Sequence, residues 1–551
     1  MPREQSPSPE LSETGGFSSG EILPPLVLAQ FLASYANSSA NVAIGDITQD
    51  LGAAVTQFQM AITFFTLIMA ALMITGSKLT DIWGRKLTFR LGIAVYALGS
   101  LVATLATSMG LMYLGFSLLQ GIGSALMIPP IYILITVSFG DLRSRAQAFG
   151  LVGAMAGLGA SSGPLVGGLL ATVISWRAIF ASQVLLALVI LYLSRRVRRV
   201  GMAGPKPALD ILGAVLSAAG MALIVFGFLL AADYGWFRAR QEFTVGGAVV
   251  VEQGGISPVW LFVGAGFVVL LAFFWHIRAR ERRGAEPLVS TRVLANRTAN
   301  LGMVTQGVQW FMLIGVSFIV PVFLQVAREQ SPIDTGLMLT PSTVGILLAS
   351  WAAGRLASTY SQRALLLWGF VVAIAGVVLM LLLGGEGAGG WSLAPGLLVF
   401  GLGAGVITTS SVNVVQSSMP EEDQGELSGL SRSVSNLGSS LGTAVAGAIL
   451  ISTLITGVIT LTQQSEVLPP EAKDRIAVAL EEDVSTLSDT QVREALQGQP
   501  RAVVDEVVRI NAEARDRALG LALLSLGLIG FLGLWASVLL PSNPTPSAPT
   551  E

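Results

Sequence analysis

Long apolar segments recur along the whole chain, and they constrain its fold more than any other feature. A helix that crosses a bilayer needs roughly 17–25 largely apolar residues, because its backbone groups must be hydrogen-bonded within the segment. Segments long enough to span, several of them longer than this minimum, are predicted at 24–46, 57–77, 88–107, 111–136, 147–172, 177–194, 209–231, 258–276, 299–326, 335–357, 363–384, 394–417, 429–461 and 518–540. The sequence therefore predicts an all-α membrane protein with 14 transmembrane helices.

The composition agrees with this prediction and excludes several classes of function. The chain is 52% hydrophobic and 12% charged, whereas a soluble domain carries about 25% charged residues. A net charge of −2 gives no sign of nucleic-acid binding. There is no cysteine, and His276 is the single histidine, so we expect no metal site and no cofactor. No Ser/His/Asp set supports catalysis, and an enzyme is not expected.

The basic residues predict the orientation of the chain. Cytoplasmic loops are enriched in Lys and Arg, and here the loops that follow the even-numbered segments are the basic ones. The other short loops carry only Arg177, Arg238, Arg240 and Arg328. This bias predicts a multi-pass protein of the cytoplasmic (inner or plasma) membrane, with the N- and C-termini in the cytoplasm.

The predicted helices group into halves that are separated by other regions. We predict a disordered cytoplasmic N-terminus (1–22), an N-terminal six-helix half (23–200), two extra transmembrane helices with a basic loop (201–297), five helices of the C-terminal half (298–461), an extracytoplasmic helical loop (462–517), the last transmembrane helix (518–540) and a disordered C-terminus (541–551).

Glycine spacing indicates that the two halves are repeats. Gly121 and Gly123 match Gly401 and Gly403, and one residue of slack then lines up a second set: Gly150, Gly159 and Gly163 with Gly429, Gly438 and Gly442. Parallel repeats of this kind are typical of membrane transporters.

A charged string lies between the second and third predicted segments, from Ser77 to Lys86. So many charges cannot lie in hydrocarbon, so the string is predicted to form a tight cytoplasmic turn. Glycine permits such a turn without strain, and an aspartate there can accept backbone N–H bonds. The residues that define the string are Leu79, Asp81, Gly84, Arg85 and Lys86.

The fifth predicted segment contains a glycine-rich string. Glycines four residues apart lie on one helix face, where a second helix can approach closely, and a proline removes one backbone hydrogen bond. The defining residues are Gly159, Gly163, Pro164, Gly167 and Gly168.

These two strings resemble motif A and motif C of the major facilitator superfamily. The 14 segments resemble its drug:proton antiporter-2 branch, which consists of multidrug efflux transporters. The resemblance implies a major facilitator fold of two six-helix halves plus two central extra helices. It also implies that motif A gates the transporter and that motif C marks an antiporter. Ser77 and Ile82 depart from motif A, where a glycine and a basic residue are usual.

Two charged residues that the family links to proton handling are replaced in this chain. Ala36 stands where the first segment usually has an aspartate, and Ser117 where the fourth usually has an arginine. A lone buried charge is expensive, so the loss of both is physically consistent. Asp46, near the outer end of the first segment, is the best remaining candidate proton site, although acidic groups near an interface are more often solvated caps.

Mostly neutral polar and aromatic residues lie in the segments that face the central cavity in this family. Polar side chains in hydrocarbon face a cavity or one another, so interhelical hydrogen bonding explains any single one of them equally well. The candidate cavity residues are Asn37, Asn41, Gln120, Tyr132, Gln306, Gln309, Trp310, Asn413 and Arg432.

As a set, these residues predict a mostly apolar cavity for a small hydrophobic or amphipathic substrate. The sequence thus predicts a secondary active transporter that exports such compounds across the cytoplasmic membrane by alternating access. It is expected to act as a monomer among membrane lipids, with no nucleic-acid partner. A proton-uncoupled or lipid-moving transporter of the same fold is the alternative, supported by the missing aspartate at Ala36.

Overall fold

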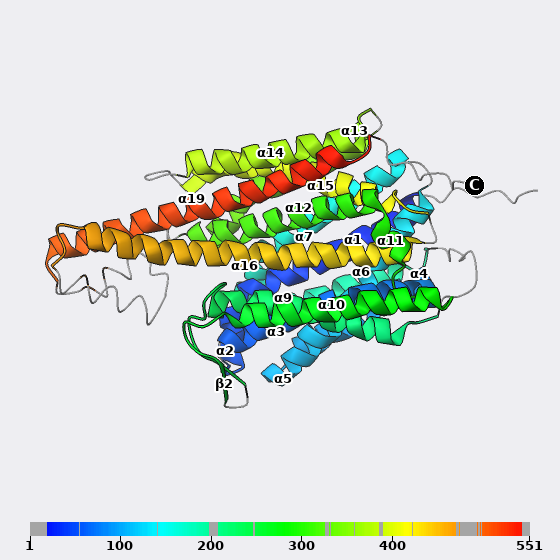
Figure 1. Cartoon of the computed structure of the whole chain (residues 1–551), viewed down its shortest axis with the longest axis horizontal. Coiled ribbons are helices and arrows are strands. Elements are labelled where there is room, and N and C mark those ends of the chain that lie inside the picture. Colours follow the sequence, from blue (N-terminus) through cyan, green and yellow to red (C-terminus); the bar gives the residue numbers. More distant parts are fainter. Residues whose placement is uncertain are drawn as a thin grey trace, which may run out of the picture.

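The computed structural model describes residues 19–53, 55–139, 142–197, 208–245, 248–324, 330, 332–357, 359–384, 390–420, 423–469, 473, 493, 496 and 499–542. Long helices dominate it and run side by side along the longest axis of the molecule (Figure 1).

The helices follow the apolar segments closely. The N-terminal part contains α1 (Ser19–Val42), α2 (Ile44–Asp50), α3 (Val55–Trp83), α4 (Arg85–Thr104), α5 (Met109–Met112), the π-helical turn η1 (Tyr113–Leu119), α6 (Gln120–Ser138), α7 (Leu142–Val173) and α8 (Arg177–Leu193). The central part contains α9 (Ile211–Tyr234), β1 (Phe243–Val245), β2 (Ala248–Val251), α10 (Pro258–Arg282) and α11 (Thr291–Ala295). The C-terminal part contains α12 (Arg297–Val322), α13 (Pro332–Leu356), α14 (Gln362–Leu383), η3 (Gly390–Leu393), α15 (Ala394–Gln416), α16 (Gln424–Gln464) and α19 (Arg501–Leu539).

Within the described residues, 11 helices are long and apolar enough to cross a membrane. The helices α1, α7 and α8 lie at the first, fifth and sixth predicted segments but are not among the 11. Helix α8 has 17 residues, and the apolar stretch recognised in α7 covers Gln147–Gly159. A small antiparallel hairpin, β1 with β2, joins α9 to α10 and was not predicted.

Matching helix pairs build the two halves. Helix α1 packs along α7 in the N-terminal half, and α12 packs along α16 in the C-terminal half. Between the halves, α7 packs on α13 and α3 packs on α16. The extra pair, α9 and α10, lies beside this interface, where α9 contacts both α3 and α16.

The glycines of the predicted repeat make equivalent contacts in the two halves. A Cβ atom on Gly159 would lie 2.5 Å from the Phe31 carbonyl oxygen of α1, and one on Gly438 would lie 3.0 Å from the Gly307 carbonyl carbon of α12. The repeat is therefore confirmed at these positions, because each half uses a bare helix face to bring two backbones together.

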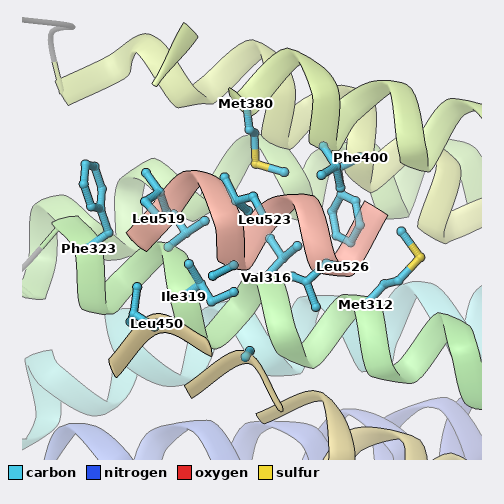
Figure 2. Close-up of a cluster of buried hydrophobic side chains, with 14 of the residues drawn as sticks. Met312, Val316, Ile319, Phe323, Met380, Phe400, Leu450, Leu519, Leu523 and Leu526 are labelled. Carbon is cyan, nitrogen blue, oxygen red and sulfur yellow. The ribbon is translucent and has the colours of Figure 1, made fainter. Parts of the chain in front are cut away.

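The apolar core of the C-terminal half forms where α12, α14, α15, α16 and α19 meet (Figure 2). Side chains from separate helices interdigitate there, among them Val316, Met380, Phe400, Leu450 and Leu523 (Figure 2). In a bilayer such contacts stabilise the half by close packing rather than by removal from water.

Helices α16 and α19 are longer than predicted. They have 41 and 39 residues, or about 60 Å each at 1.5 Å per residue, which is twice the hydrocarbon thickness of about 30 Å. Figure 1 shows them projecting together beyond the other helices. We call this the projecting end, and we call the opposite end, where α3 ends at Trp83, the motif end.

The predicted loop at 462–517 is therefore helical over part of its length. Helix α19 begins at Arg501 rather than at 518, because its first turns find partners on α16. The Ser465 hydroxyl donates to Glu506 Oε1 at 2.6 Å, and Ile510 and Ala514 are buried. Most of the remaining loop residues lie outside the described part of the chain.

Candidate functional site

Helix α3 and the first turn of α16 are joined by charged contacts at the motif end. Lys78 Nζ lies 3.0 Å from Glu426 Oε1, and the two side chains are 7% and 11% exposed. The second oxygen of Glu426 accepts the Ser290 backbone N–H at 2.6 Å, at the start of α11. The Ser77 hydroxyl donates to the Gly425 carbonyl. These contacts close the motif end, because they hold one half against the other.

Asp81 lies directly over Gly425. A Cβ atom on Gly425 would lie 2.7 Å from Asp81 Oδ1 and 2.5 Å from Asp81 Cγ. Helix α16 begins at Gln424, so the carboxylate faces a helix N-terminus, where the helix dipole and free N–H groups favour a negative charge. Only a glycine leaves room for this approach.

The turn of motif A is shorter than predicted. Helix α3 runs to Trp83 and α4 begins at Arg85, so Gly84 alone separates the two helices. Its φ of 95° lies in the region that favours glycine. The Thr88 hydroxyl donates to the Gly84 and Leu79 carbonyls at 3.2 and 3.3 Å. The predicted turn at Gly84 is thus confirmed.

The two basic residues after Gly84 hold this turn in place. Arg85 is buried at the start of α4. Lys86 Nζ donates to the Arg195 carbonyl, just beyond α8, at 2.9 Å.

Motif C forms the bare face of α7 that packs on α1. A Cβ atom on Gly163 would lie 2.6 Å from Ser38 Cβ and 2.8 Å from the Ser39 backbone nitrogen. One on Gly167 would lie 3.0 Å from Ser39 Cβ. Gly168 is half-buried, and the side chain of Pro164 lies outside the described residues.

Two predicted cavity residues, Tyr132 and Arg432, meet a third residue, Gln30, between the halves. Arg432 of α16 is 7% exposed, and its guanidinium carbon lies 4.2 Å from the centre of the Tyr132 ring of α6. Arg432 Nη2 donates to Gln30 Oε1 of α1 at 3.2 Å, and the Tyr132 hydroxyl donates to the same oxygen at 3.3 Å. We call Gln30, Tyr132 and Arg432 the interface trio.

Other predicted cavity residues lie elsewhere in the C-terminal half. Gln306 of α12 accepts a hydrogen bond from the Ser431 hydroxyl at 2.5 Å. Ser431 precedes Arg432 on α16, so this contact lies close to the interface trio. Gln309 is 2% exposed, and neither atom of its amide has a hydrogen-bond partner. Asn413 of α15 is buried, and Trp310 is half-buried.

Some predicted site residues are not brought to this interface. Gln120 donates to Ser100 at 3.0 Å and to Gln183 at 3.1 Å, within a polar cluster of α4, α6 and α8 inside the N-terminal half. Asp46 is exposed on the short helix α2. The side chains of Asn37 and Asn41 lie outside the described residues.

Sequence reasoning missed Gln30 and Glu426. Gln30 is the single polar residue in the apolar run 26–33 of its segment, which is a usable signal because such residues tend to face a partner or a cavity. Glu426 lies in a predicted connection between two segments, where carboxylates are common and therefore do not indicate a site. No local pattern pairs it with Lys78, which lies 348 positions away.

His276 also has a partner that was not predicted. Its Nε2 lies 2.9 Å from Asp210 Oδ1, and Asp210 caps α9 by accepting the Gly213 N–H at 3.0 Å. Burial disfavours the charged Asp210 carboxylate, but the Gly213 N–H, His276 and Arg280 outweigh burial and lower the pKa of Asp210. This contact clamps the two extra helices together at the motif end.

Two halves of matching helix pairs, closed against each other at one end by charged contacts, define a membrane transporter of the alternating-access class. A family model makes the assignment more specific. The chain belongs to the Major Facilitator Superfamily, whose model matches residues 26–239 and 243–443. Family and fold thus define a multi-pass membrane transporter rather than an enzyme.

Relatives and solved structures agree with this family. The chain is 30% identical over 438 residues to the puromycin resistance protein pur8 of Streptomyces alboniger, covering 78% of this chain and 81% of that protein. It is 29% identical over 423 residues to the probable actinorhodin transporter of Streptomyces coelicolor, covering 75% and 69%. The multidrug resistance protein Stp of Mycobacterium tuberculosis is 25% identical over 414 residues, covering 75% and 72%.

The fold also matches solved transporter structures. The proton:xylose symporter XylE gives a TM-score of 0.56 at 12% identity, covering 96% of this chain and 97% of that chain. The human organic anion transporter MFSD10 gives 0.52 at 14% identity, covering 78% and 93%. At these identities the likeness concerns the fold alone.

Proposed function

We propose that this protein is a secondary active transporter of the plasma membrane that exports hydrophobic or amphipathic compounds by alternating access. The main support is the closure of the motif end, where Lys78, Glu426 and Asp81 hold α3 against the start of α16. Such contacts must break for cargo to enter from that side and re-form to release it on the other. The names of the relatives, which refer to drug resistance and export, support the direction of transport.

The proposed architecture has fourteen membrane helices. Helices α1, α7 and α8 would complete the 11 candidate spans, because each packs within the N-terminal half alongside helices of that set or one another. An even number places both termini on the cytoplasmic side, which is the motif end. The protein would act as a monomer, with lipids around it.

A charge-swap experiment tests the proposal. Lys78→Glu and Glu426→Lys should each greatly reduce export of a drug panel containing puromycin and ethidium, because breaking a buried ion pair costs about 3–5 kcal/mol. The double variant should regain part of the activity. Drug accumulation in cells with equal protein levels is the measurement. The export function would be refuted if the wild type lowered the accumulation of none of the compounds in the panel.

Proton coupling is a separate element of the proposed function. Ala36 and Ser117 replace the usual charged residues, and Ser117 instead donates to the Ala61 carbonyl at 2.7 Å. We propose that coupling is weak and that Asp46 supplies most of it. The alternative is an uncoupled or lipid-moving transporter, which the absence of a carboxylate at position 36 favours.

Asp46→Asn is expected to remove most of the substrate-induced proton release while sparing substrate binding. The carboxylate is the group that would gain and lose the proton, whereas the amide cannot titrate. Proton release upon drug addition, measured in weakly buffered detergent with a pH dye, compares the two proteins. Strong release that is unchanged in Asp46→Asn would show that the coupling site lies elsewhere.

A further inference from the structure

Arg432 carries a buried positive charge between the two halves. Its side chain is 7% exposed, and its Nε has no hydrogen-bond partner. Its described contacts are the Gln30 amide oxygen at 3.2 Å and the face of the Tyr132 ring at 4.2 Å. Among the described residues, no carboxylate forms an ion pair with Arg432. A guanidinium has five N–H donors, and the hydrogen bond described here uses one of them, on Nη2.

Such an arrangement is unusual inside a membrane protein. Charged residues at membrane depth are costly, and they ordinarily pair with an opposite charge. The uncharged contacts from Gln30 and Tyr132 compensate Arg432 only partly, because an amide oxygen and a ring face each carry a partial negative charge. An anion would compensate it fully, and two parallel N–H donors fit a carboxylate.

The surroundings of Arg432 suit a molecule with one charged and one apolar end. Asn436 lies four residues along α16, on the same helix face, and its Nδ2 is buried without a hydrogen-bond partner. It is a second donor for an oxyanion. The Tyr132 ring in turn stacks on Phe149 of α7, with 6.0 Å between the ring centres, which provides an aromatic surface.

We propose that Arg432 binds the anionic group of the cargo, so that the exported compounds include amphipathic organic acids. This inference rests on the proposed export function and names a substrate class for it. In the closed arrangement, Gln30 and Tyr132 of the N-terminal half occupy the guanidinium. When the halves separate at the motif end, α16 leaves α1 and α6, and the exposed guanidinium binds a carboxylate in their place.

The position of the trio favours a cargo carboxylate over the headgroup of an annular lipid. All three residues are at least nine-tenths buried between the halves, on α1, α6 and α16. A lipid at the outer surface of the bundle does not reach them. Phosphatidylglycerol is nevertheless a suitable competitor in the test, because its phosphate offers the same oxyanion chemistry.

A matched pair of probes tests the inference. Pyrenebutyrate and its neutral amide have the same aromatic body and differ in charge. In nanodiscs of neutral lipid, the wild type is expected to bind the acid about tenfold more tightly than the amide, which is the effect of one charge-assisted hydrogen bond. Arg432→Gln should bind both equally, and Arg432→Lys should retain part of the preference. Arg515→Gln, which removes another buried arginine on α19, should behave like the wild type.

Energy transfer from tryptophan to pyrene reports the affinities, and thermal unfolding verifies that each variant is folded. An equal affinity of the wild type for the two probes, or no binding of either, would overturn the inference. The same holds if Arg432→Gln keeps the preference, or if phosphatidylglycerol displaces the acid from the wild type. Export of puromycin, ethidium and pyrenebutyrate is measured separately, so an unselective exporter is distinguished from a protein that exports nothing.

Discussion

Gly425→Val is expected to reduce export by at least an order of magnitude while the protein remains folded in the membrane. The new side chain would meet the Asp81 carboxylate, because even its Cβ would lie 2.5 Å from Asp81 Cγ. Relieving this overlap separates α16 from α3 and removes the Lys78–Glu426 contact, whose loss costs about 3–5 kcal/mol if the charges stay buried. The motif end should therefore remain open.

The absence of cysteine from the chain makes this prediction measurable without background labelling. Spin labels on Arg196→Cys and Tyr360→Cys report the distance between the halves at the motif end, since both residues are exposed there. Gly425→Val should shift the distribution to longer distances. Gly264→Val is the matched control, because a Cβ at Gly264 of α10 meets nothing within 4 Å. Wild-type distances and export in Gly425→Val would contradict the proposed gate.

Asp81→Ala and Gly84→Val should also abolish export, for different reasons. The first removes the carboxylate at the N-terminus of α16, and the second forces a branched side chain to adopt a φ of 95°. Normal export by both variants at equal expression would remove the assignment of motif A as the gate.

Gly163→Leu is also expected to have a large effect, through the packing of α7 rather than through the gate. A Cβ at this position already lies 2.6 Å from Ser38 Cβ and 2.8 Å from the Ser39 nitrogen, so a leucine must push α1 away from α7. Overpacking of this kind typically costs about 1–3 kcal/mol. The atoms in the way include the backbone of α1, which cannot rotate aside as the end of a flexible side chain can. We expect a lowered melting temperature and export below a tenth of the wild-type rate.

Two further variants make this experiment specific. Gly264→Leu introduces the same side chain into a helix with open space around it and should be neutral. Gly442→Leu should reproduce the defect, because a Cβ at Gly442 would lie 3.0 Å from Phe311 Cα on the equivalent helix pair of the other half. Melting temperature and drug efflux are compared for all three. Wild-type behaviour of Gly163→Leu would show that the match to motif C reflects only the high glycine content of the chain and has no role in transport.

Local features of the sequence determined the positions of the helices and of two functional strings. Runs of apolar residues place a helix at each predicted segment, because hydrocarbon leaves the backbone few alternatives. Gly84 forces the turn between α3 and α4, and glycines at a spacing of four produce the bare faces of α7 and α16. These features depend on residues that are close together in the chain, so they can be read without a structure.

Only the tertiary structure decided which residues meet across the interface. Gln120 was expected at the cavity but bonds within its own half, whereas Gln30 was overlooked and contacts Arg432 from 402 positions away. Likewise, α19 begins at Arg501 because α16 lies beside it. A polar side chain in hydrocarbon must find a partner, but the local sequence around it does not specify which of several neighbouring helices supplies that partner. Helix packing makes that choice, since it fixes the face of each helix that turns toward the other half.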